Sequence, residues 1–147
     1  MEFKKDLYFL SNFYHSPIDV FMKEYPTVEH AYQARKTEDE GLRELIRNAD
    51  TPGKAKRLGQ NVPLREDWEK IKRMTMISLV YKKFNSSTEL RDLLLGTGDQ
   101  ELVEGNTWHD NYWGDCSCSR CREIVGENHL GEALMTVRRI LEARKED

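Results

Sequence analysis

The chain has 147 residues, of which 38% are hydrophobic, 10% aromatic and 33% charged. That length suits one domain with its own hydrophobic core, and the aromatic content excludes an intrinsically disordered chain. The formal net charge of −3 excludes a protein that coats nucleic acid with a strongly basic surface, but it leaves room for a nucleotide or a single base held in a pocket.

No apolar run reaches membrane-spanning length, and the N-terminal residues lack the apolar segment of a signal peptide. The cysteines are odd in number and lie close together between residues 116 and 121, which is not the pattern of a disulfide framework. We therefore expect one cytoplasmic domain that spans residues 1–147 and has no membrane partner. The sequence leaves its oligomeric state open.

Residues 3–25 are predicted to form short extended pieces. Residues 7–10 and 19–22 are rich in aromatic and β-branched side chains, and turn-forming residues lie between them. A small antiparallel hairpin is expected here, with a register that the pattern does not specify.

Helical patterns dominate the rest of the chain. Thr27, Thr37, Thr51 and Ser86 are predicted N-caps, and those at Thr37 and Ser86 have the spacing of a capping box. Gly59 and Gly96 are typical stop residues. The helices are expected over residues 27–36, 37–48, 51–59, 66–84, 86–96 and 130–143.

Two of these helices have clear apolar stripes, in which apolar residues recur every three or four positions. The last helix should turn Leu130, Leu134, Val137 and Leu141 inward. In the longest helix the predicted stripe is Trp68, Ile71, Met74, Ile77, Tyr81 and Phe84. The predicted fold class is therefore α+β, a predominantly α-helical single domain with a small N-terminal antiparallel β element.

Glu29, Gln33 and Lys36 share one face of the first helix, because they occupy positions i, i+4 and i+7. A carboxylate, an amide and an amine aligned in this way can bind a polyol and move protons. The same pattern is typical of a solvated helix face, and spacing alone favours that interpretation.

Residues 97–128 form a long polar segment, and a loop of this length in a compact domain is more often functional than not. Trp108, Tyr112 and Trp113 lie within six positions of it, among several Asn and Asp residues. Aromatic faces can stack on bases while Asn and Asp hold ribose hydroxyls. Alternatively, Trp108 and Trp113 anchor the loop in the core, and the pattern favours neither interpretation.

The same segment contains Cys116, Cys118 and Cys121, with His109 upstream. Three cysteines and one histidine form an accepted ligand set for a structural zinc ion. The ligands are more crowded than in most zinc sites, so the spacing favours three reduced thiols over a metal site.

Several segments are recognisable as an ordered set. They are FLSNF at residues 9–13, VEHAYQA at 28–34 with Lys36, KAKRLG at 54–59, LVEGN at 102–106, WG at 113–114 and NHLG at 128–131. In this order and spacing, nearly the whole chain resembles the NADAR family, also called YbiA-like. The cysteine cluster lies where many members have a glycine-rich stretch.

The resemblance implies a mainly helical N-glycosidase. Some members cleave ribosylamino pyrimidine intermediates of riboflavin synthesis, and others are thought to remove ADP-ribose from guanine bases. By motif, the expected catalytic residues are Glu29, Lys36 and Asp110. The expected substrate-binding residues are Ser11, Asn12, Phe13, His30, Gln33, Trp68, Glu104, Asn106, Trp113, Asn128 and Arg138.

Both substrate classes attach ribose C1 to an exocyclic amine. Either a carboxylate activates water, or Lys36 attacks C1 and forms a transient Schiff base, with Glu29 as general acid and base. The second route requires a lowered pKa at Lys36, through burial or a nearby cation such as Arg138. Neither route requires a cofactor, so any zinc would be structural.

The expected partner is a nucleotide-like small molecule or an ADP-ribosylated base in nucleic acid. The basic residues Lys54, Lys56 and Arg57 can hold a pyrophosphate, although a solvated basic face is the more common reason for such a run. Two other classes remain open, a module that binds ADP-ribose without turnover and a zinc-stabilised nucleic-acid protein. The negative net charge speaks against the last.

Overall fold

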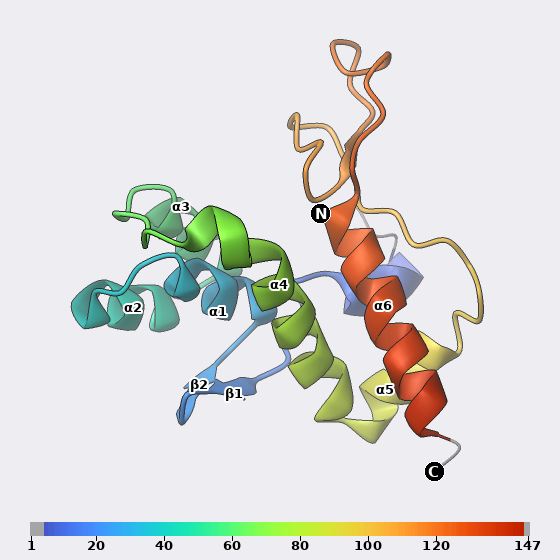
Figure 1. Cartoon of the computed structure of the whole chain (residues 1–147), viewed down its shortest axis with the longest axis horizontal. Coiled ribbons are helices and arrows are strands. Elements are labelled where there is room, and N and C mark those ends of the chain that lie inside the picture. Colours follow the sequence, from blue (N-terminus) through green and yellow to red (C-terminus); the bar gives the residue numbers. More distant parts are fainter. Residues whose placement is uncertain (1–4, 146–147) are drawn as a thin grey trace. The chain divides into compact units, whose positions relative to one another are not determined.

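The computed structural model describes residues 5–145, which form two compact units (Figure 1). The central unit is the continuous stretch of residues 12–83. The terminal unit combines residues 5–11 with residues 84–145.

The central unit begins with an antiparallel hairpin of β1 (Ile18–Val20) and β2 (Lys23–Tyr25). Its turn is made by Phe21 and Met22, which have φ values of 50° and 68°. Positive φ at both central residues is the geometry of the tight hairpin turn that matches strand twist. The predicted hairpin is therefore present, but the extended stretch expected at 19–22 is wrong at its end, because its last two residues form the turn.

Four helices follow the hairpin: α1 (Val28–Arg35), α2 (Glu40–Arg47), α3 (Pro52–Gly59) and α4 (Trp68–Asn85). The caps of α1 and α3 are as predicted, since the side chains of Thr27 and Thr51 accept hydrogen bonds from the third residue after each. The cap predicted for α2 is wrong. Asp39 caps it, because the Thr37 hydroxyl accepts a hydrogen bond from the Asp39 backbone in a turn that precedes the helix.

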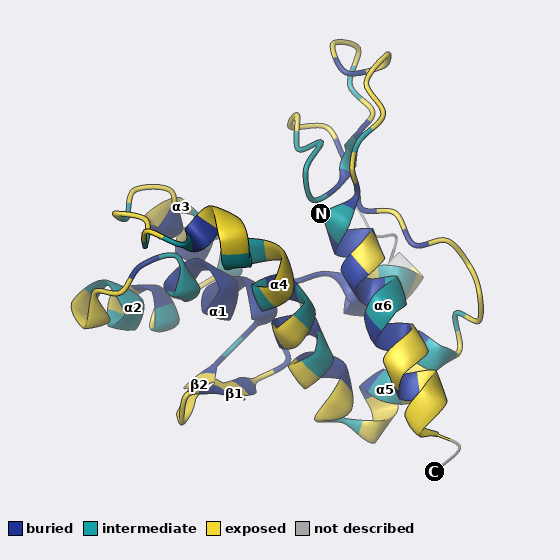
Figure 2. Cartoon of the chain, viewed as in Figure 1, coloured by how far each residue is buried: buried dark blue, intermediate teal, exposed yellow. Residues whose placement is uncertain are grey.

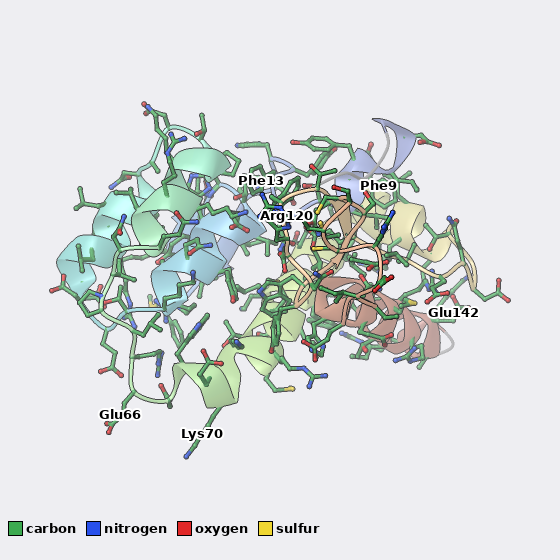
Figure 3. The ribbon with its side chains drawn as sticks, turned by 90° about the horizontal axis from the view of Figure 1, so that it is seen from above. Phe9, Phe13, Glu66, Lys70, Arg120 and Glu142 are labelled. Atoms are coloured by element: carbon green, nitrogen blue, oxygen red, sulfur yellow. The ribbon has the colours of Figure 1, made fainter. Side chains whose placement is uncertain are left out.

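Helix α4 packs a different stripe from the predicted one. Met74 is 66% exposed, and Ile71, Ile77 and Tyr81 are only half-buried. The side chains of Glu66, just before the helix, and Lys70, in its first turn, point outward (Figure 3). The predicted stripe is correct at its two ends and wrong between them, because the inner face there runs through Met76, Leu79 and Val80. The buried side chains are Trp68, Met76, Leu79, Val80, Lys83 and Phe84.

The terminal unit opens with a 3-10 helix, η1 (Lys5–Leu10), where extended structure was predicted for residues 7–10. Its last turn is closed by a hydrogen bond from the Ser11 backbone N–H to the Tyr8 carbonyl. The turn buries Phe9 and Leu10 together, and the Phe9 ring meets that of Phe84 edge to face with centroids 6.3 Å apart. This paired burial explains why the strand prediction failed.

Two helices of the terminal unit, α5 (Thr88–Leu95) and α6 (His129–Arg144), contact each other. Ser87 caps α5, not Ser86 as predicted, since Ser87 Oγ accepts from the Leu90 backbone. Between the helices lies a short parallel pair of β3 (Gly105–Asn106) and β4 (Asp115–Cys116), which was not predicted. Helix α6 buries the four predicted residues Leu130, Leu134, Val137 and Leu141.

The six α-helices and the small antiparallel hairpin within residues 5–145 confirm the predicted α+β, mainly helical class. Among these described residues, no helix is both long and apolar enough to cross a membrane.

Candidate active site

Helix α1 is buried from Val28 through Ala34, although much of it is polar (Figure 2). Glu29 is only 8% exposed and Gln33 only 3%. The Gln33 amide Nε2 donates a hydrogen bond of 2.9 Å to Glu29 Oε1. Lys36, at the C-terminal cap, is half-buried, and its Nζ lies 5.7 Å from the centroid of the Tyr32 ring. The interpretation of these residues as a solvated face is therefore wrong.

Burial shifts the two proposed catalytic groups in opposite directions. It raises the pKa of the Glu29 carboxyl, while the hydrogen bond from Gln33 and the cations of Lys56 and Lys36 oppose that rise. Burial lowers the pKa of the Lys36 amine, Glu29 opposes this, and the cations of Lys56 and Lys72 lower it further. A carboxyl that holds its proton and an amine that loses its proton are the forms that acid and nucleophilic catalysis need.

The start of α1 is fixed by backbone and imidazole hydrogen bonds. The Glu29 N–H donates to the Asn12 carbonyl at 3.1 Å, and Asn12 Nδ2 lies 3.4 Å from the sulfur of Met76. His30 Nδ1 lies 2.8 Å from Thr27 Oγ1, and its Nε2 lies 3.0 Å from the Ala49 carbonyl oxygen. Both ring nitrogens of His30 are therefore engaged within the central unit, so binding substrate through either one would require breaking a buried contact.

Trp68 lies at the first position of α4 and is 4% exposed. Its ring packs against that of Tyr32, with centroids 5.2 Å apart and an interplanar angle of 56°. The contact attaches α4 to α1 beside Lys36. Phe13, which was predicted to bind substrate with Asn12, is half-buried.

Lys83 was not identified from the sequence. It is 1% exposed, and burial lowers its pKa to about 7. Its Nζ lies 5.3 Å from the centroid of the Tyr14 ring, a cation–π geometry when the amine is protonated. Lys83 and Phe84 belong to the ordered motifs of the family resemblance, but Lys83 was not predicted as a site residue, because it and the exposed Lys82 are both basic residues in the last turn of α4.

In the terminal unit, Asn106 and Asp110 organise the loop that carries Trp113. The buried Asn106 side chain donates to the Asp110 carbonyl at 2.8 Å and accepts from the backbone N–H of Asp110 and Trp108. Asp110 Oδ1 accepts from the backbone N–H of Tyr112 at 3.1 Å and of Trp113 at 2.9 Å. These two side chains therefore shape the turn that presents the aromatic residues.

The two tryptophans of this loop lie in different surroundings. Trp108 is 41% exposed, so the interpretation of it as a core anchor is wrong. Trp113 is half-buried, and its ring packs with those of Tyr112 and His129, with centroids 4.9 Å apart for Tyr112 and Trp113, 4.4 Å for Tyr112 and His129, and 6.4 Å for Trp113 and His129. This aromatic cluster lies at the N-terminal end of α6.

Asn128 and Arg138 hold the chain that leads into this loop. Asn128 Oδ1 accepts from the backbone N–H of the buried Glu104 at 3.0 Å, and its Nδ2 donates to the Leu102 carbonyl at 2.9 Å. Arg138 donates to Thr97 Oγ1 and to the Gln100 carbonyl, both at 2.8 Å. Both side chains thus have positioning contacts within the terminal unit.

The cations that lower the pKa of the Lys36 amine in the central unit are Lys56 and Lys72, whereas the sequence suggested Arg138 for this role.

The proposed metal ligands His109, Cys116, Cys118 and Cys121 are brought together. Their ligand atoms all lie within 4.8 Å of one another. None of the three cysteines forms a disulfide.

Comparisons with known proteins agree with this architecture. A family model described as the NADAR domain matches residues 2–142. The chain is 43% identical over 137 residues to a protein of Shigella boydii named N-glycosidase YbiA, covering 92% of this chain and 82% of that one. It is 38% identical over 136 residues to a riboflavin biosynthesis protein of Vibrio vulnificus, covering 91% of this chain and 35% of the longer protein. An NMR structure of the E. coli protein YbiA is 41% identical and superposes with a TM-score of 0.83, over 97% of this chain and 83% of that one.

Proposed function

The chain belongs to the NADAR domain family, and from that premise we propose that it is an N-glycosidase, a hydrolase that cleaves the bond between ribose C1 and an exocyclic amine. The observation that carries the proposal is the pair of Glu29 and Lys36, whose pKa values burial shifts toward each other. The names of the similar proteins support the reaction class, since the Shigella relative is an N-glycosidase.

In the proposed mechanism the ribose ring of the glycosylamine first opens. The C1–O4 bond breaks, O4 takes the proton of the Glu29 carboxyl, and the exocyclic nitrogen shares its electron pair with C1 to form an iminium ion. The neutral Lys36 amine then adds to C1. Proton transfer from the Lys36 nitrogen through Glu29 lets the exocyclic amine depart with the electrons of its bond to C1, which leaves a Schiff base on Lys36.

Water completes the reaction. It adds to C1 of the Schiff base, Glu29 accepts a proton from it, and the lysine leaves as a free amine while C1 becomes an aldehyde. The sugar then closes to its ring form. The net change is the consumption of one water, and no redox or organic cofactor takes part. Gln33 supports this chemistry because its amide holds Glu29 Oε1 in one orientation.

We propose that the substrate is ADP-ribose attached to guanine, either in a nucleic acid or in a smaller nucleotide-like compound, and that the reaction takes place in the cytoplasm.

The positive charge of helix α3 supports a substrate with an anionic group near the proposed catalytic pair, because the Lys56 cation acts electrostatically on both Glu29 and Lys36. Lys54 and Arg57 of the same helix line a surface cavity of about 460 Å³ together with Asn48 and Asn61. Cations and amide donors of this kind suit a pyrophosphate. Lys54 also pairs with Asp50 at 3.0 Å, which weakens its contribution.

The remaining site residues enter the proposal through their motifs. Asp110 is proposed to act in catalysis. Contact with the substrate is proposed for Ser11, Asn12, Phe13, His30, Gln33, Trp68, Glu104, Asn106, Trp113, Asn128 and Arg138.

A second candidate substrate is a ribosylamino pyrimidine. It is favoured by the relative from Vibrio vulnificus, which is named a riboflavin biosynthesis protein. Both compounds carry the same ribose–amine bond, so they differ only in groups distant from C1.

Parallel assays test the proposal. The protein is incubated with ADP-ribosylated guanine in DNA and with a ribosylamino pyrimidine, and the released sugar is measured. We expect turnover of the first, a loss of at least about 100-fold in Glu29→Gln, and a borohydride-trapped adduct on wild type that is missing in Lys36→Ala. Lys82→Ala, an exposed lysine of α4, serves as the control.

Three outcomes contradict parts of this proposal. Release of sugar only from the pyrimidine would replace the substrate. Activity retained in Lys36→Ala without any trapped adduct on wild type would exclude the lysine route. Tight binding of ADP-ribose by wild type and Glu29→Gln alike, without turnover of either substrate, would make the protein a binding module.

A further inference from the structure

The segment of residues 105–127 in the terminal unit folds with almost no hydrophobic core of its own. Figure 1 shows it in orange, extending beyond the N-terminal end of α6. Trp108 is 41%, Ile124 51% and Val125 90% exposed, and Tyr112 and Trp113 are half-buried where they pack against His129 of α6. The buried residues of this segment are Asn106, Gly114, Cys116 and Cys121. A chain segment that buries so little usually needs another source of stability, such as a metal.

Cysteine and histidine side chains converge inside this segment from separate turns. Cys116 ends β4, Cys118 and Cys121 lie at the two ends of a turn closed by the Cys121 N–H and the Cys118 carbonyl, and His109 comes from the preceding loop. His109 Nδ1 lies 3.3 Å from the sulfur of Cys118 and 3.3 Å from that of Cys121. All four ligand atoms lie within 4.8 Å of one another.

These separations suit four ligands around one tetrahedral ion. With zinc–sulfur and zinc–nitrogen bonds of about 2.3 and 2.0–2.1 Å, neighbouring ligand atoms of a tetrahedron are roughly 3.5–3.8 Å apart. We propose that His109, Cys116, Cys118 and Cys121 bind a zinc ion. Because four protein ligands fill a tetrahedral shell, the ion has a structural role and no open position for a substrate.

Hydrogen bonds around the sulfurs add to the case. The backbone N–H of His109 donates to the Cys116 sulfur at 3.3 Å, and Asn111 Nδ2 lies 3.4 Å from the Cys121 sulfur. N–H groups aimed at sulfur stabilise the negative thiolate that a zinc ligand must be. Asn111 also accepts from the Cys116 backbone at 2.9 Å through its Oδ1, so one side chain orients two of the ligands.

The ion would hold the loop that carries Asn106, Asp110 and Trp113. His109 lies between Asn106 and Asp110, whose mutual hydrogen bonds shape that loop, and Cys116 pairs with Asn106 through the β3–β4 bridge. Removing the metal should therefore loosen this loop together with the cysteine turn. This consequence for substrate binding rests on the proposed function, whereas metal binding itself does not.

Metal analysis and thiol titration test the proposal on the full chain. We expect one zinc per chain in protein purified without chelator, and tetrahedral cobalt absorption bands with thiolate charge transfer when cobalt replaces zinc. Cys118→Ser should lose most of the metal, while Ser119→Ala, an exposed position in the same turn, should keep it. After removal of zinc and denaturation, all three thiols should react with a thiol reagent.

Two results would overturn the proposal, whatever the outcome of the glycosidase assays. One is folded protein with three reactive thiols that takes up neither added zinc nor added cobalt. The other is a chain with only one reactive thiol, because the remaining two cysteines would then form a disulfide. Limited proteolysis with and without chelator provides a second measurement, in which zinc should protect residues 106–126 from cleavage.

Discussion

A Cβ atom placed on Gly59 would lie 1.9 Å from Oε1 of Gln33. Helix α3 thus reaches the amide of the residue that orients Glu29, and only a residue without a side chain fits at that contact. The glycine that was predicted as a helix stop also sets the distance between α3 and α1.

Gly59→Ala should therefore destabilise the protein by about 1–3 kcal/mol through overpacking. The displaced Gln33 amide would no longer donate to Glu29, so the pKa of Glu29 should rise further. Urea denaturation measures the first effect, and the acid limb of the pH–rate profile measures the second. Gly53→Ala is the matched control in the same helix, since its Cβ would meet only Thr51 Oγ1 at 3.8 Å. Equal stability of the two variants would contradict the close contact.

The pH dependence of the reaction should respond to Lys56 and Lys72 differently. The active form, protonated Glu29 with neutral Lys36, holds one proton on the pair and shares that total with the form in which the proton lies on Lys36. Activity should therefore rise as the pair loses its first proton, mainly from Glu29, and fall as it loses its second, mainly from Lys36. Lys56 lowers the pKa of both groups, whereas Lys72 lowers only that of Lys36. Lys56→Met should move both limbs of the profile to higher pH, and Lys72→Met should move only the alkaline limb.

Lys70→Met is the control for these two variants, because Lys70 lies on α4 with Lys72 but is exposed and points outward (Figure 3). Its profile should match that of wild type. Identical shifts in all three variants would indicate a general charge effect and not the two local ones.

Two substitutions of Asp110 should separate its contribution to the structure of the loop from its proposed contribution to catalysis. Its Oδ1 accepts two backbone hydrogen bonds, and the carbonyl oxygen of an asparagine can accept the same two. Asp110→Asn should therefore keep the thermal stability of wild type while lowering kcat by about 10-fold or more through loss of the charge. Asp110→Ala should lose both activity and about 1 kcal/mol of stability. Full activity in Asp110→Asn would restrict the residue to shaping the turn.

Lys83 should make stability depend on pH. Its pKa falls from 10.5 to about 7 on folding, so between these values the unfolded chain binds more protons, and stability rises as the pH increases. Lys83→Met removes that cost and should stabilise the protein by about 2–4 kcal/mol near neutral pH. The gain should shrink to less than about 1 kcal/mol at about pH 10, because the pH then approaches the pKa of about 10.4 that lysine has in the unfolded chain, and the difference in protonation between the two states costs little.

Urea denaturation of wild type and Lys83→Met at both pH values measures this effect. A gain that is the same at both would show that packing, and not the buried amine, is responsible. Loss of sugar release in a stabilised Lys83→Met would make Lys83 a second candidate nucleophile beside Lys36.

Much of the fold follows from short-range sequence signals. Thr27 and Thr51 cap their helices as predicted, and α6 turns its four predicted residues inward, because a regular apolar stripe leaves little choice of face. The prediction failed where tertiary packing decides between near-equal local options. At Thr37 and Asp39, either side chain can cap a helix, and the turn formed by their mutual hydrogen bond selects Asp39.

The site residues were harder to predict, since their burial is set by contacts distant in sequence. Glu29 and Gln33 have the spacing of a solvated face, yet the Asn12 backbone and Gly59 lie against that helix. The buried Lys83 was not predicted to lie in the core, because a lysine is expected at the surface. The predicted apolar stripe of α4 left it out and placed the exposed Met74 inward instead. The four proposed zinc ligands could be grouped from the sequence because they lie within one loop.

The burial of α1 on all sides also bears on how the protein tolerates change. A helix with one inward face accepts substitutions at most of its positions, as α2 should, where only Ile46 is buried. Residues 28–34 have no such permissive side. In a saturation mutagenesis experiment they should appear as an unbroken block of intolerant positions, in which polar residues are as constrained as apolar ones.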